Sequence, residues 1–227
     1  MAQEILSHFF IDCATLLRME LLDSVFVIVV IMLSAVIHEV MHGYAADKLG
    51  DPTARYAGRL TLNPIPHLDP FGSVMLPLIL ALSGSPLFFG WAKPVPYNPY
   101  NLVKAPYWGE AIVAFAGPLS NFALALLAAI VIRTGLLSPE LNSVIFIIVM
   151  VNIMLGIFNL IPIPPLDGSK ILSAILPLGL RMQYDRIRAQ LEYNPFLGFG
   201  IVIIFVLVLG GAFGSFVYTI ARAIAGV

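Results

Sequence analysis

Four long apolar segments constrain this chain more than any other feature of its sequence. Each approaches the roughly 20 residues that a helix needs to cross a bilayer. Their approximate bounds are 25–44, 110–132, 141–161 and 196–220. Hydrophobic residues make up 59% of the 227 residues and charged residues only 11%, whereas a typical soluble domain has about 25% charged residues. The sequence therefore predicts an all-α polytopic membrane protein, a bundle of about four to six transmembrane helices.

The region between the first two long segments is rich in proline. The stretches 60–72 and 90–101 are expected to be extended rather than helical, because proline interrupts helical hydrogen bonding. Between them, segment 73–90 is broken by Pro77 and Pro86. If the ends of the first and third long helices meet at one site, this segment must cross the membrane zero or two times. We therefore expect a re-entrant hairpin or a pair of surface segments there, on the cytoplasmic side.

Basic residues divide unevenly between the two sides that this topology defines. The richer side carries Lys48, Arg55, Arg59, Lys93, Lys104, Lys170, Arg181, Arg186 and Arg188. The other side carries Arg18, Arg133 and Arg222. The positive-inside rule places the richer side in the cytoplasm. The net charge of −1 excludes strong electrostatic attraction to nucleic acid, and the single cysteine, Cys13, excludes both an internal disulfide and a site built from several thiolates.

The first long segment carries three ionisable residues within five positions, which is costly in a membrane helix. His38 and His42 are four residues apart, so they share one helix face. Two imidazoles placed in this way can bind one Zn²⁺, and Glu39 is placed to act as a general base toward water. The alternative is a solvated helix end. His38 lies nine residues before Asp47, about 13 Å of helix, and this depth disfavours that alternative.

A catalytic zinc ion needs a third protein ligand and one open position. The candidates are His67 and Asp69 in the first Pro-rich stretch, and Asp167 at the end of NLIPIPPLDG (159–168). Three prolines break the helix before Asp167, and open backbone at membrane depth is tolerated only when it is buried in protein or borders a wet cavity. Asp167 could equally cap a helix that starts at LDGSKIL. Local chemistry leaves ligand and cap open.

Together these motifs resemble the site-2 protease family of intramembrane zinc metalloproteases. HEVMH (38–42) lies in a membrane helix, and NLIPIPPLDG (159–168) is similar to the family's NxxPxxxxDG segment. GPLSN (117–121) resembles a further family motif, GPxxN. NPIPHLDPFGS and GWAKPVPYNPYNL resemble stretches of compact bacterial members. The resemblance covers about residues 25–175.

The resemblance implies a role for each matching residue. It implies a single Zn²⁺ held by His38, His42 and Asp167. Glu39 would be the acid and base, and Asn159 would contact the substrate or the transition state. Asn121 would do the same, with interhelical hydrogen bonding as an equal alternative. His67 would support the site or recognise substrate, with a plain loop histidine as the alternative.

The resemblance also implies an activity and a place for it. We expect hydrolysis of a peptide bond in or near the transmembrane segment of a membrane-protein substrate, with the lipid bilayer as the other partner and no nucleic acid. The active site would face the cytoplasmic side of the cell membrane. Residues 1–24 would form an interfacial segment, 25–175 the catalytic core, and 176–227 a loop and the last membrane helix. The short loop after the second long helix leaves no room for a PDZ domain, which predicts a minimal core.

Three other functions fit less of the sequence. A protease of prenylated C-termini would need a further glutamate ligand from a later helix, but Glu110, Glu140 and Glu192 all lie near predicted helix ends. An ion or metal transporter could use the same His, Glu and Asp residues, but the chain shows no inverted repeat. A binding protein without activity should have lost part of HExxH, which is intact here.

Overall fold

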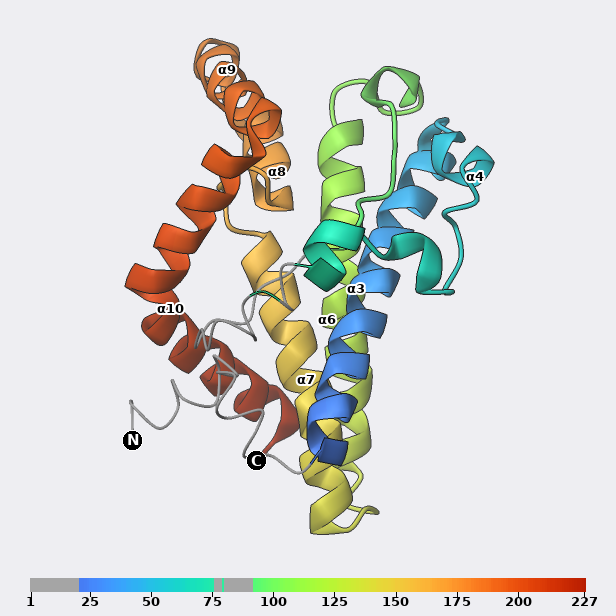
Figure 1. The fold of residues 1–227 in the computed structure, drawn as a ribbon, viewed down its shortest axis with the longest axis vertical. Coiled ribbons are helices and arrows are strands. Elements are labelled where there is room, and N and C mark those ends of the chain that lie inside the picture. The colour runs from blue at the N-terminus through green and yellow to red at the C-terminus, as the bar shows by residue number, and fades with distance from the viewer. Residues whose placement is uncertain (1–20, 76–78, 80–91) are drawn as a thin grey trace.

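The computed structural model describes residues 21–75, 79 and 92–227 (Figure 1). Its long helices are α3 (Leu21–Leu49), α6 (Gly109–Arg133), α7 (Pro139–Asn159) and α10 (Pro195–Ala225). All four are long and apolar enough to cross a membrane. Within the described residues, the fold is helical and contains no strand. The predicted all-α fold is confirmed, and the four candidate spans among the described residues agree with the predicted four to six.

The first Pro-rich stretch differs from the prediction. Residues 60–72 are not extended throughout, because they contain a 3₁₀ turn, η1 (Ile65–His67), and the start of a short π-helix, η2 (Pro70–Met75). Pro66 lies in the first turn of η1 and Pro70 begins η2, where the missing N–H costs no helical hydrogen bond. The described part of the second stretch, from residue 92, is free of helix until the 3₁₀ turn η3 (Pro99–Asn101).

The chain leaves α3 and enters α6 at the same end of the bundle. The backbone N–H of Lys104 donates to the carbonyl of Leu49 over 3.1 Å. The short helix α4 (Thr53–Tyr56) lies at this end too (Figure 1). Residues 76–78 and 80–90 lie outside the described residues, so the zero or two crossings of segment 73–90 stay a prediction.

Two shorter helices follow α7. α8 (Asp167–Ile175) begins after the proline turn, and α9 (Leu178–Tyr193) occupies a region that we expected to be a loop. Leu, Arg, Met, Gln and Glu, all good helix formers, dominate α9. Ion pairing fixes its position, since Arg188 Nη1 lies 2.9 Å from Glu110 Oε1 in the first turn of α6. Because α9 carries several charged residues, it does not stand out as an apolar segment in the sequence.

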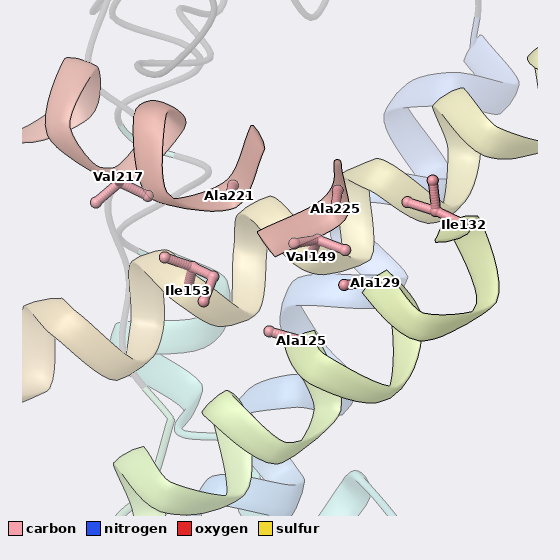
Figure 2. Close-up of a cluster of buried hydrophobic side chains, with 8 residues drawn as sticks. All are labelled: Ala125, Ala129, Ile132, Val149, Ile153, Val217, Ala221 and Ala225. Carbon is pink, nitrogen blue, oxygen red and sulfur yellow. The ribbon is translucent and has the colours of Figure 1, made fainter. Parts of the chain in front are cut away.

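Alanine and β-branched side chains form the core between α6, α7 and α10 (Figure 2). The buried residues are Ala125, Ala129, Ile132, Val149, Ile153, Val217, Ala221 and Ala225. Alanines let helix backbones approach closely, which matters in a bilayer because the hydrophobic effect does not drive helices together there. α6 also packs against α3 and α8. The middle of α6 is therefore placed to contact both HExxH and the residues that follow NLIPIPPL.

The basic residues of the described chain separate as predicted between the two ends of the bundle. The larger group belongs to the end of α3, to α4, α8 and α9, and to the connections around them, which gather at one end (Figure 1). At the opposite end, Arg133 donates from Nε to the carbonyl of Ile224 over 2.6 Å and from Nη2 to that of Ala223 over 2.7 Å. Arg133 thereby satisfies carbonyls in the last turn of α10.

Candidate metal centre

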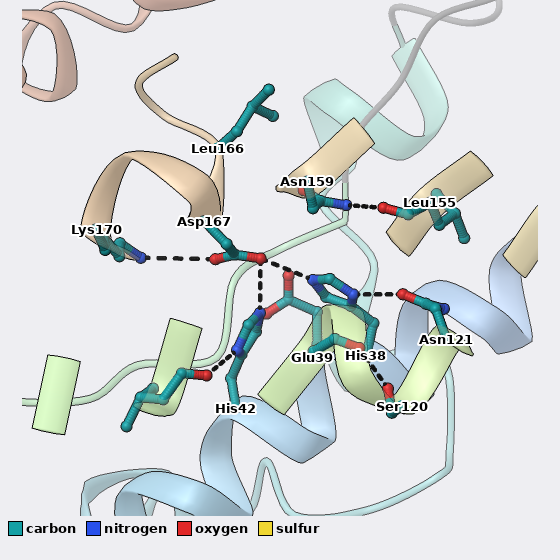
Figure 3. Close-up of polar contacts among 12 residues, drawn as sticks. His38, Glu39, His42, Ser120, Asn121, Leu155, Asn159, Leu166, Asp167 and Lys170 are labelled. Carbon is teal, nitrogen blue, oxygen red and sulfur yellow. Dashed lines mark hydrogen bonds and ion pairs between the residues drawn. The ribbon is translucent and has the colours of Figure 1, made fainter. Parts of the chain in front are cut away.

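Helix α3 presents His38 and His42 on the face that meets α6, opposite Asp167 at the start of α8 (Figure 3). Both side chains are buried, and their rings lie edge to face with centroids 4.6 Å apart. The one-turn spacing predicted from the sequence therefore produces a pair of adjacent imidazoles inside the protein, not a solvated helix end.

Asp167 completes a group of three. Its Oδ2 lies 3.1 Å from His38 Nε2 and 3.2 Å from His42 Nε2. It is also the first residue of α8, where Leu166 is the N-cap. The two interpretations left open by the sequence thus meet in one residue: Asp167 begins a helix, and its carboxylate faces the histidines. Among the described residues, these three side chains are the ones placed to share a metal ion.

Gly168 explains why an aspartate can reach this position. A Cβ on residue 168 would collide with the carbonyl groups of Leu160 and Ile161 at the end of α7. Glycine therefore lets the first turn of α8 pack directly on the turn that follows α7. This close approach of backbones holds Asp167 over the face of α3.

Hydrogen bonds fix the orientation of both imidazoles. His38 Nδ1 lies 2.6 Å from Asn121 Oδ1, and His42 Nδ1 lies 2.7 Å from the carbonyl oxygen of Val113. Both partners are acceptors, so each Nδ1 carries a hydrogen and donates it. In the neutral rings the Nε2 lone pairs then face Asp167 Oδ2. Lone pairs that converge on a carboxylate repel one another unless a cation lies between them.

Zinc fits this arrangement. Tetrahedral zinc with bonds of about 2.0–2.1 Å separates its ligand atoms by about 3.3 Å, close to the observed histidine–aspartate distances. Gly117, in the GPLSN motif of α6, leaves the necessary space, because a Cβ there would lie 2.5 Å from His42 Nε2 and 2.6 Å from His38 Nε2. Two imidazole nitrogens and one carboxylate oxygen form a common set of ligands for catalytic zinc.

Asp167 has a polar neighbour besides the two histidines. Lys170 lies on the other side of the carboxylate, with Nζ 4.0 Å from Oδ1. Oδ1 therefore faces a cation of the protein, and Oδ2 remains directed at the histidines.

A cavity of about 160 Å³ opens beside this group. Glu39, Asn159 and Lys170 line it together with the three candidate ligands. Glu39 Oε2 accepts a hydrogen bond of 2.8 Å from the backbone N–H of Val95. The proposed acid and base is thus held at the same cavity as the candidate metal ligands.

The loop that carries Val95 is anchored on Asp51. This buried carboxylate accepts 2.6 Å and 3.0 Å hydrogen bonds from Asn98 N and Asn101 Nδ2. It also accepts from the hydroxyl of Thr53 at the start of α4. Asp51 therefore ties the residues after α3 to the loop that contacts Glu39.

The remaining candidate residues occupy three different positions. Asn159 lines the cavity, and its Nδ2 donates to Leu155 O over 2.9 Å. Asn121 is fully buried behind His38 and has the interhelical hydrogen bonds that we considered as its alternative role. His67 does not line the cavity. It is buried in its loop, where Nε2 donates to Thr61 O over 3.0 Å.

Sequence reasoning missed several groups that shape the site. The N–H of Val95 leaves no signal, because any residue except proline offers a backbone donor. Asn152 did leave one, since it is the single polar side chain between Val144 and Phe158 in the middle of the apolar segment 141–161. Gly117 lay within a recognised motif, but only the approach of both imidazoles shows its role.

Comparison with known proteins identifies the family. The model of peptidase family M50 matches residues 135–207, which include Asn159 and Asp167. The Bacillus subtilis protein named "Putative zinc metalloprotease YwhC" is 36% identical over 194 residues, 82% of this chain and 82% of that protein. This chain belongs to peptidase family M50. The site-2 protease resemblance is thereby confirmed, and M50 membership together with the four apolar helices indicates a multi-pass membrane metallopeptidase that uses zinc.

Two further relatives also carry zinc metalloprotease names. The protein named "Putative zinc metalloprotease Rip2" of Mycobacterium tuberculosis is 30% identical over 201 residues, 86% of this chain and 73% of that protein. "Zinc metalloprotease MJ0392" of Methanocaldococcus jannaschii is 28% identical over 148 residues, 65% of this chain but 33% of that protein. No solved structure matches the chain at a significant level.

Proposed function

We propose that this M50 chain is an intramembrane zinc endopeptidase. It would cleave a peptide bond in or near the transmembrane segment of a membrane-protein substrate, as a step of regulated intramembrane proteolysis. The observation that carries this proposal is the convergence of His38, His42 and Asp167 beside a cavity that Glu39 also lines. Three of these four residues belong to an apolar span, Val25–Leu49, so the chemistry would take place at membrane depth.

Six polar residues in or behind the cavity receive a role in this proposal. His38, His42 and Asp167 would hold one Zn²⁺, which when bound polarises a carbonyl and makes water more acidic. Glu39 accepts a proton from the attacking water and returns it to the leaving amine. The amide of Asn159 contacts the substrate backbone or the developing oxyanion. Because Asn121 is buried behind His38, it orients that imidazole.

The substrate must be extended where it is cut, since a helix hides its carbonyls in its own hydrogen bonds. An extended segment of the protein could capture such a peptide by strand addition, and the two Pro-rich stretches 60–72 and 90–101 are the candidates. The helical turns in 60–72 make that stretch unsuitable. The segment 92–98 remains the candidate, because it carries no helix and Pro94, Val95 and Tyr97 line the cavity.

The proposed site lies toward the cytoplasmic side of the cell membrane. It is nearer the end of the bundle that carries most basic residues, and basic residues favour the cytoplasmic side. His42 lies six residues, about 9 Å of helix, before Lys48 in the last turn of α3.

The substitution Glu39→Gln tests the proposal. The full chain would be produced in membranes together with a panel of tagged single-span proteins, and shortened fragments would be measured. The wild type should release a fragment that Glu39→Gln does not, because loss of a general base costs about 10²–10⁴ in rate. Zinc content should be equal in both. Glu140→Gln, at the start of α7 and away from the cavity, is the matched control. Full activity in Glu39→Gln would refute the proposed role.

A further inference from the structure

Asn152 is a buried amide in the middle of α7 that the proposed mechanism does not use. It is fully buried within an apolar membrane helix, where a polar side chain is costly unless its hydrogen bonds are satisfied. Its Nδ2 donates to Ile148 O and to Ser34 Oγ, each over 3.0 Å. Its Oδ1 accepts from Asn121 Nδ2 over 2.9 Å. Asn152 thus joins α7 to both α3 and α6.

The donors and acceptors along this chain of contacts can be assigned in one direction only. The carbonyl of Ile148 can only accept, so the NH₂ group of Asn152 must face it. The oxygen of Asn152 then faces Asn121, which must present its own NH₂ group. The carbonyl of Ser34, 3.4 Å from Asn121 Nδ2, requires the same orientation.

The orientation of Asn121 determines which nitrogen of His38 carries the hydrogen. With its NH₂ group directed at Asn152, Asn121 presents Oδ1 to His38, 2.6 Å away. His38 must therefore carry its hydrogen on Nδ1, which leaves Nε2 unprotonated toward Asp167. The opposite tautomer would place a hydrogen on the nitrogen that a metal needs.

The two histidines differ in the type of acceptor that keeps the hydrogen on Nδ1. His42 donates to the backbone carbonyl of Val113, which cannot exchange its acceptor for a donor. His38 donates to a side-chain amide, which presents a donor instead if it rotates by half a turn. Only His38 therefore depends on a further residue that holds its partner in place.

We infer that Asn152 is a positioning residue for the metal centre. Its hydrogen bond to Asn121 fixes the orientation of that amide, and through it the tautomer of His38 that binds the ion. The inference rests on the proposed function, because it assumes that His38 is a metal ligand. It adds a residue outside the cavity, on a helix that supplies neither histidine.

The affinity of the protein for zinc tests the positioning role of Asn152. Dissociation constants would be obtained by chelator competition on the full chain for wild type, Asn152→Leu, Asn121→Leu and the double variant. We expect each single variant to weaken zinc binding about 10–100-fold. The double variant should bind no more weakly than Asn121→Leu, because Asn152 acts through Asn121. Asn142→Leu, ten residues earlier on α7 and about 15 Å along its axis, is the control and should bind as the wild type does.

The tautomer itself gives a second readout. In the zinc-free full chain with ¹⁵N-labelled histidine, the wild-type spectrum should show His38 protonated on Nδ1, and Asn152→Leu should show a mixture. If Asn152→Leu does not fold, Asn152→Ser, which is too short to contact Asn121, takes its place. Wild-type zinc affinity and an unchanged tautomer in these variants would overturn the inference, as would losses that multiply in the double variant. A wild type that binds no zinc would contradict the proposed function instead, and the spectrum would still decide whether Asn152 sets the tautomer.

Discussion

At the scale of single residues, the site depends on one missing methyl group. Gly117 faces the Nε2 atoms of both histidines, and a Cβ at this position would lie 2.5 Å and 2.6 Å from them. Alanine would fill the space that a metal ion and its ligands need. Because alanine is the better helix former by about 1 kcal/mol, its effect on α6 alone would be stabilising.

We therefore predict that Gly117→Ala weakens zinc binding at least about tenfold while helix content is unchanged. Zinc affinity and circular dichroism of the purified full chain measure the two effects. Gly179→Ala is the matched control, because a Cβ at residue 179 meets no atom within 4 Å. Zinc binding of Gly117→Ala at wild-type strength would show that the ion does not lie between these imidazoles.

Residue roles divide into those that the sequence could predict and those that depend on the fold. The spacing of His38 and His42 fixes their common face through helix geometry alone, so this part of the site could be predicted. The approach of Asp167 needs the turn after α7 and Gly168, which local patterns left undecided. The contact between Val95 and Glu39 joins two segments by a backbone donor, which no residue type indicates.

At the scale of elements, the loop that carries Val95 positions the proposed base. Asp51, just after α3, holds Asn98 and Asn101 of this loop, and the loop places the N–H of Val95 on Glu39. Hydrogen bonds to a charged group contribute about 1.5–3 kcal/mol each, so loss of Asp51 should free the loop. The zinc ligands belong to other elements and should keep their positions.

We predict that Asp51→Ala lowers kcat about tenfold or more and leaves the zinc content unchanged. Fragment release and metal analysis on the same preparation measure both quantities. Tyr100→Ala alters the same loop at an exposed position and should retain activity. Equal loss of zinc and activity in Asp51→Ala would show that the loop supports the whole centre and not Glu39 alone.

Helices could be predicted from the sequence where a local pattern of residues marks them. Each span is a long apolar run, and length decides its assignment. α9 was missed because it is a charged helix of 16 residues without such a run. The 3₁₀ and π turns within 60–75 were missed because proline excludes the interior of a helix but not its first turn.

At the scale of the whole molecule, the uneven charge of the two ends predicts an orientation. In a Cys13→Ser background, Tyr100→Cys and Leu136→Cys would each introduce one thiol at an exposed position, at opposite ends of α6. A membrane-impermeant maleimide should label Leu136→Cys in intact cells, and Tyr100→Cys only after the membrane is permeabilised. The reverse pattern would place the candidate metal centre toward the outer side.

The zinc content of the purified protein tests the central claim, that His38, His42 and Asp167 hold one catalytic metal ion. Wild type, Asp167→Ala and Asp69→Ala would be purified in detergent under metal-replete conditions and analysed for zinc per chain. The account predicts about one zinc ion in the wild type and in Asp69→Ala, and little in Asp167→Ala, because removal of one of three ligands leaves an incomplete site. A wild type without zinc, or equal zinc in Asp167→Ala, would contradict it.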